Sequence, residues 1–131
     1  MSEELLGEED SDNRSGPYCV VWIYRDSPDA FERAARYALQ NVGYGLPVVI
    51  VFTDAGAKLL QTDRVVHLMR VPGMNALVDS LVDHHVFFEL DIGAARRAGH
   101  IETLGCLPNL KIADEQRVAE LATGARVTVR Y

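Results

Sequence analysis

The sequence predicts an α/β fold: a three-layer α/β/α sandwich around a five-stranded, mainly parallel sheet. Residues 17–24 (PYCVVWIY) and 46–52 (LPVVIVF) are continuous apolar runs rich in β-branched and aromatic residues. Such runs are typical of strands that are covered on both faces, as in parallel sheets. Segments with helical periodicity separate the strand-like runs, and this alternation favours helices packed on both faces of one parallel sheet.

The chain divides by charge into a short acidic segment and a nearly neutral domain. Residues 1–16 hold six acidic residues and one arginine, a net charge of −5, whereas residues 17–131 hold 13 acidic and 12 basic residues, a net of −1. We expect 1–16 to be a disordered acidic tail and 17–131 to be a single domain. A nearly neutral domain lacks the basic surface that nucleic-acid binding requires.

The sequence also predicts no membrane partner and a cytoplasmic location. No apolar run approaches the roughly 20 residues that a membrane-spanning helix needs, and the amino-terminal segment has no signal-peptide pattern. The two cysteines form no Cys-x-x-Cys motif and indicate no disulfide framework.

The first half of the domain is predicted to run strand, helix, strand, short helix. Ser27 followed by Pro28 favours a helix start after the first strand, and Gly43 or Gly45 should end that helix. After the second strand, Asp54 is a possible cap of a short helix. Residues 63–73 could form a helical turn or a loop. The apolar stretch 65–74 (VVHLMRVPGM), which overlaps them, could cover the core or, as we prefer, form a subunit contact.

The second half is predicted to continue helix, strand, helix, strand, helix, strand. Residues 75–85 form an amphipathic helix, 86–90 (VFFEL) a strand and 92–99 a short helix. Residues 109–114 form a fourth strand, and Asp114 caps a helix that ends at Gly124. The last strand, 125–131, alternates polar and apolar residues, which favours an edge position.

A ligand-binding rim is expected beyond the carboxyl ends of the strands, where ligands bind in open parallel sheets. Strands one, two and three each deliver an aspartate there: Asp26, Asp54 and Asp91. They could bind a hard cation, but aspartate is also a favoured helix cap, and we prefer capping because it explains each position. We expect no metal and no cofactor. The rim residues are Arg25, Asp26, Ser27, Thr53, Asp54, Gly56, Asp91 and Gly93.

The histidines and cysteines give weaker signals. His84 and His85 precede the third strand, so they should lie at the opposite, amino end of the sheet as exposed residues of a helix end. Cys19, at the beginning of the first strand, should be a buried core thiol. Cys106, in the loop before the fourth strand, should also lie at the amino end, away from the rim.

Three stretches resemble the DsrE/DsrF-like family of small sulfur-relay proteins: FTDAGAKLL, VDHHVFFELDIGAARRAGH and LPNLKIADEQRVAELATGARVTVRY. The resemblance covers roughly residues 18–131. It implies a five-stranded parallel sandwich, assembly into homo-oligomers or hetero-oligomers with other sulfur-relay proteins, and a persulfide carried by a cysteine at the end of the third strand. In this chain Asp91 matches that position, give or take a residue or two, and no cysteine lies between Phe87 and His100.

This departure leaves three hypotheses open. The preferred one is a DsrE-like protein that serves as a non-catalytic subunit or as a module that binds a small ligand or a partner. The alternative is an active sulfurtransferase that carries persulfide on Cys106, the weak candidate for a catalytic residue. The minor alternative is a cation-binding acidic rim formed by Asp26, Asp54 and Asp91.

Overall fold

The computed structural model describes residues 17–99, 101–102 and 106–131. The expectation of a disordered tail concerns residues 1–16, which lie outside the described residues. His100 also lies outside them. Among the described residues, none of the helices combines the length and the apolar character that a bilayer crossing requires.

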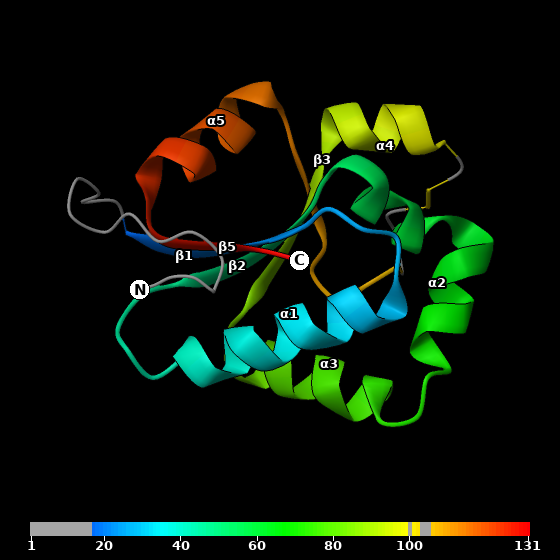
Figure 1. Cartoon of the computed structure of the whole chain (residues 1–131), viewed down its shortest axis with the longest axis horizontal. Helices are drawn as coiled ribbons and strands as arrows, with labels where there is room; N and C mark the ends of the chain where they lie inside the picture. Colours follow the sequence, from blue (N-terminus) through cyan, green and yellow to red (C-terminus); the bar gives the residue numbers. More distant parts are fainter. Residues whose placement is uncertain (1–16, 100, 103–105) are drawn as a thin grey trace.

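Five parallel strands form one sheet, as the sequence predicted (Figure 1). The strand order is β4-β3-β2-β1-β5, and all four strand pairs are parallel. The last strand pairs only with β1, which confirms its predicted edge position. The strands are β1 (Tyr18–Ile23), β2 (Val48–Phe52), β3 (Phe87–Asp91), β4 (Lys111–Ala113) and β5 (Ala125–Arg130).

The helices lie on both sides of this sheet and beyond its carboxyl end (Figure 1). α1 and α3 pack together below the sheet in this view, and α5 lies above it. α4 follows β3 and packs against the 3-10 helix η1, which follows β2. The elements are α1 (Pro28–Asn41), η1 (Asp54–Leu60), α2 (Thr62–Met69), α3 (Met74–Asp83), α4 (Ile92–Ala98) and α5 (Glu115–Gly124).

The two faces of the sheet bury two separate clusters of apolar side chains. On one face, Val21, Ile50 and Phe88 pack beneath the helical layer of α1, α2 and α3. On the other face, Val20 and Val51 pack against the residues of α5 and the start of β5. Burial on both faces explains why the first two strands read as continuous apolar runs, since successive side chains point to opposite sides.

The ambiguous segment 63–73 is mostly helical, because α2 occupies Thr62–Met69. Leu68 of this helix and Met74 just beyond it are each about 1% exposed and belong to the larger core. The segment therefore covers the core, the first of its two predicted roles. Val66 on the outer side of α2 is 46% exposed, and its role as a subunit contact stays a prediction.

Candidate functional site

Three predicted rim residues form one hydrogen-bonded unit at the carboxyl ends of β2 and β3. The Thr53 hydroxyl donates to Oδ2 of Asp91 over 2.7 Å, and the Gly93 N–H donates to Oδ1 over 2.9 Å. Thr53 is buried and Asp91 is half-buried. Because β2 and β3 are parallel neighbours, their ends meet at this edge. Both oxygens of Asp91 are thus engaged by groups of the protein itself, and Asp91 caps α4 as predicted.

Gly56 holds η1 tightly against the end of β1. Its N–H donates to the Thr53 carbonyl over 2.8 Å, and the Thr53 N–H donates to the Ile23 carbonyl over 3.0 Å. A Cβ added at Gly56 would lie only 2.0 Å from the Ile23 oxygen, so a larger residue cannot occupy this position without a shift of backbone. The rim at Gly56 is therefore filled by the main chain of this domain, and this glycine has a packing role.

The other two aspartates of the rim are paired with arginines. Oδ2 of Asp26 lies 3.1 Å from Nη1 of Arg64, and Oδ1 of Asp54 lies 3.9 Å from Nη2 of Arg97. Both aspartates are exposed, so these are surface ion pairs. The structure thus does not gather Asp26, Asp54 and Asp91 around one cation, and the described residues contain no group of three acidic, histidine or cysteine side chains that could hold a metal ion. The described geometry therefore does not support a cation site shared by these three aspartates.

The capping interpretation is correct at some positions and wrong at others. Besides Asp91, Asp114 caps α5, since its Oδ1 accepts the Arg117 N–H over 2.8 Å. Asp54 lies within η1, with a left-handed φ of 49°, and makes no capping hydrogen bond. Ser27 occupies the N-cap position of α1, but its side chain makes no capping hydrogen bond. Neighbouring Arg25 is exposed. The rim residues therefore split between one hydrogen-bonded unit and separate surface positions.

Cys106 does not lie at the amino end of the sheet, contrary to the expectation from topology. Its thiol lies 3.7 Å from the carbonyl oxygen of Leu60, the last residue of η1. η1 leaves the carboxyl end of β2, so the loop before β4 carries Cys106 back towards that side. A loop that ran directly to the start of β4 would place Cys106 at the amino end, but this loop packs against the end of η1 instead. Half-burial raises the pKa of the Cys106 thiol to about 11, which leaves it protonated at neutral pH.

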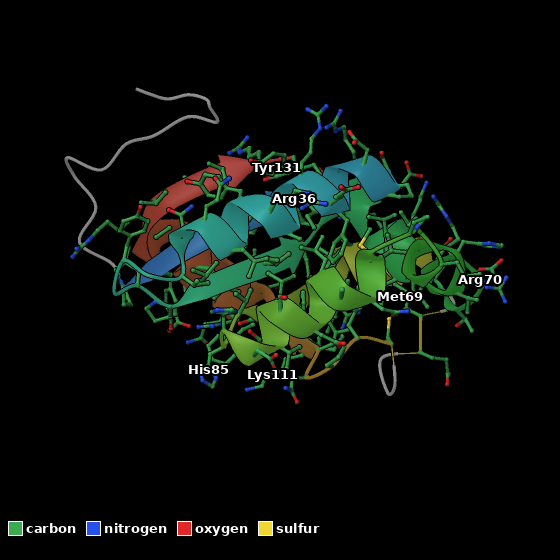
Figure 2. All side chains as sticks on the ribbon, turned by 90° about the horizontal axis from the view of Figure 1, so that it is seen from below. Arg36, Met69, Arg70, His85, Lys111 and Tyr131 are labelled. Atoms are coloured by element: carbon green, nitrogen blue, oxygen red, sulfur yellow. The ribbon has the colours of Figure 1, made fainter. Side chains whose placement is uncertain are left out.

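Cys19 matches its prediction as a core thiol. It is 2% exposed within the larger apolar cluster, and burial raises its pKa to about 11. His84 and His85 are exposed at the end of α3, as predicted. Figure 2 shows His85 towards the end of the molecule where β1 begins, and Arg70 at the opposite end.

Two hollows lie near the carboxyl rim. One, of about 730 Å³, is lined by residues at the start of α2 and after α4: Gln61, Thr62, Asp63, Ile101 and Glu102. The other, of about 330 Å³, lies where α4 and α5 begin and is lined by Ile92, Arg96, Asp114, Glu115 and Gln116. The second fits the expected place for a ligand, since Ile92 and Asp114 directly follow β3 and β4. Of the residues that line this second hollow, Asp114 was predicted from the sequence, as a helix cap, and the others carry no signal in the sequence.

A buried ion pair between Glu89 and Arg117 also went unrecognised in the sequence. Glu89 is 4% exposed in the middle of β3, and its carboxylate lies 2.7 Å from Nη2 of Arg117 on α5. Arg117 also donates to the Tyr18 hydroxyl over 3.2 Å and to Glu120 over 2.8 Å. Its hydrogen bonds to Glu89 raise the pKa of Arg117. An acid inside the apolar run VFFEL signals that a buried partner is needed, but spacing does not identify the partner.

Among solved structures, the fold of this chain is similar to that of the YchN protein of E. coli. The crystal structure of YchN matches with a TM-score of 0.60 and 17% sequence identity, and the match covers 87% of this chain and 99% of the YchN chain. No protein-family profile matches the sequence, and no curated protein does so either. YchN is a DsrE/DsrF-like protein. At this low identity the likeness establishes that the two chains share a fold.

Proposed function

We propose that this chain is a DsrE-like protein of sulfur metabolism that acts as a non-catalytic subunit, binding a partner protein or a small ligand at the carboxyl end of its sheet. The fold shared with YchN supports the general family. The observation that carries the proposal is the state of Asp91, which stands where the resemblance implies a sulfur-carrying cysteine. Both of its oxygens accept hydrogen bonds from the same domain, from Thr53 and Gly93.

An aspartate at this place can support the scaffold but cannot carry sulfane sulfur. The carboxylate satisfies the first turn of α4, as a reactive thiolate at a helix start would also do. Sulfur transfer needs a thiolate that attacks the sulfur donor, and a carboxylate does not form a persulfide. The scaffold of the site is therefore kept without its reactive atom.

The alternative, a persulfide on Cys106, has weaker support. Cys106 lies on the correct side of the sheet, against Leu60, but its thiol has a pKa of about 11. At pH 7 only about one such thiol in ten thousand would be ionised. Relay cysteines generally have a lowered pKa, because the thiolate is the nucleophile.

Cyanolysis distinguishes these two functions. The purified chain and a Cys106→Ser variant are exposed to polysulfide, desalted and treated with cyanide, and the thiocyanate released from sulfane sulfur is measured. We expect the two proteins to release the same background amount. One equivalent of thiocyanate from the native chain and none from the variant would support the sulfurtransferase instead.

For the ligand-binding role, the hollow between α4 and α5 is the place to examine. It is lined by Arg96 together with Asp114 and Glu115, so it offers both signs of charge to a polar ligand or a partner side chain. An Arg96→Ala variant should weaken binding of any such partner while it leaves folding intact, because Arg96 is exposed. A matched control is Arg36→Ala on α1, also exposed.

A further inference from the structure

We propose that the acidic amino-terminal segment of the chain, residues 3–9, binds a groove at the amino end of its own sheet, with Leu5 and Leu6 inserted between the groove walls. This surface lies at the opposite end of the sheet from the rim discussed above. The proposal therefore adds an interaction that the function at the carboxyl end does not include.

The groove is a hollow of about 350 Å³ between two connections at the amino end of the sheet. One wall is the segment that joins α1 to β2, and the other is the junction of α3 and β3. The side chains that matter most here are Val42, Leu46, Pro47, His84, His85 and Phe87. Its size lies within the range of pockets that hold small ligands or a few side chains.

Phe87 is unusually exposed for a residue in a strand of this sheet. It is 44% exposed, although it is the first residue of β3 and pairs in register with the fully buried Val49. Its neighbours Phe88 and Leu90 are fully buried. An exposed aromatic side chain next to an apolar hollow is a feature of binding surfaces, because water is readily displaced from it.

The groove combines apolar walls with two polar rings. Among the described residues that line it, His84 and His85 are the titratable ones, and none is acidic. Nδ1 of His84 donates a hydrogen bond to the Ser80 carbonyl over 2.8 Å, which holds the ring beside the groove. The sequence of residues 3–9 is EELLGEE, an apolar pair with two glutamates on each side. The leucines suit the apolar walls, and the glutamates suit the imidazole rings.

The start of β1 brings this segment close to the groove. The Cys19 N–H donates to the Pro47 carbonyl over 2.9 Å, so β1 begins directly beside a residue of the groove wall. Leu6 lies eleven positions before Pro17 in the sequence, which gives a reach of up to about 36 Å. Tethering raises the effective concentration of the segment to the millimolar range, so even weak contacts suffice.

A second copy of the folded domain fits the groove less well. Stable dimers bury about 800 Å² on each partner over a broad surface, whereas this groove holds only a few side chains. A short peptide with two apolar anchors matches its dimensions better.

The test uses the full chain labelled with a nitroxide at its amino terminus. A Ser2→Cys substitution is made in a Cys106→Ser background, where buried Cys19 is shielded from the label. In a ¹⁵N-enriched sample we expect the amides of Gly45, Leu46, Val48 and residues 84–87 to lose most of their signal. The amides of Val66 and Ile112, which are equally exposed elsewhere, should keep theirs.

The matched control is the same labelled chain with Leu5→Ser and Leu6→Ser, in which the lost signals should return. An unchanged pattern of the other amide signals of residues 17–99 and 106–131 shows that the variant is folded. Equal, weak broadening over the whole surface would overturn the proposal. Broadening that appears only when labelled and ¹⁵N-enriched chains are mixed would also overturn it, because the segment would then bind a neighbouring molecule.

Discussion

The Thr53 hydroxyl lies 2.7 Å from Oδ2 of Asp91, and this hydrogen bond joins the ends of β2 and β3. Asp91 at the same time accepts the Gly93 N–H at the start of α4. One carboxylate therefore connects two strands and a helix at the place where this fold is expected to carry its site. The following predictions test what that carboxylate and its surroundings contribute.

Asp91→Ala should lower the free energy of unfolding by about 2–3 kcal/mol, because it removes a helix cap and leaves the buried Thr53 hydroxyl without its acceptor. Chemical denaturation followed by circular dichroism measures the change. The control is Asp26→Ala, which removes an exposed ion pair with Arg64 and should cost less than about 1 kcal/mol. Equal losses in the two variants would argue against a capping role for Asp91.

Glu89→Ala should lower the free energy of unfolding by about 1.5–3 kcal/mol, because Arg117 loses its charged hydrogen bonds to Glu89 but keeps its ion pair with Glu120. Replacing both residues by leucine should cost much less than that, since no unpaired charge remains in the interior. Thermal unfolding of the single and double variants measures the difference. If the double variant were as unstable as Glu89→Ala, the loss of stability would come from the missing attraction between Glu89 and Arg117. It would then not come from an unpaired charge left behind.

Gly56→Ala should destabilise the chain by about 1–3 kcal/mol or more, because the new methyl group would meet the Ile23 carbonyl at 2.0 Å. Gly43→Ala is the matched control, since a Cβ at that glycine has no atom within 4 Å. Urea midpoints of the two variants provide the comparison. A tolerated substitution at Gly56 would show that η1 does not pack against β1 as described.

The two thiols should make stability fall at alkaline pH. The pKa of each is raised from an ordinary 9.0 to about 11 in the folded chain. The unfolded chain therefore loses these protons first, so the stabilisation is fully present below about pH 9 and is lost as the pH rises towards 11. The unfolding midpoint measured from pH 8 to pH 11 should fall less steeply in a Cys106→Ser variant. An identical slope in both proteins would mean that the Cys106 pKa is not raised.

Much of the fold follows from local pattern, and particular residues show where that pattern stops. Runs such as VVIVF identify strands covered on both faces, and the alternation in the last strand identifies an edge, because both are direct consequences of side-chain burial. The fourth strand is shorter than predicted: only Lys111–Ala113 pair with β3. Strand length depends on the neighbouring strand, which periodicity does not describe.

The site was predictable in its position but not in its contacts. The rule that ligand sites lie beyond the carboxyl strand ends correctly brought Thr53 and Asp91 to one edge. It could not predict that Arg64 and Arg97 would pair with the other two aspartates, because those arginines come from α2 and α4. The predicted position of Cys106 at the amino end was wrong for a related reason. The path of a long loop depends on what the loop packs against, and here it packs against the end of η1.

The central claim is that the chain keeps a sulfur-relay scaffold without a residue that accepts sulfur. The most direct measurement is the intact mass of the native protein after incubation with a persulfide-charged donor protein and removal of the donor. The account predicts an unchanged mass, because Asp91 is engaged as a cap and the Cys106 thiol stays protonated. A mass increase of one sulfur atom, located on Cys106 and removed by cyanide, would contradict it.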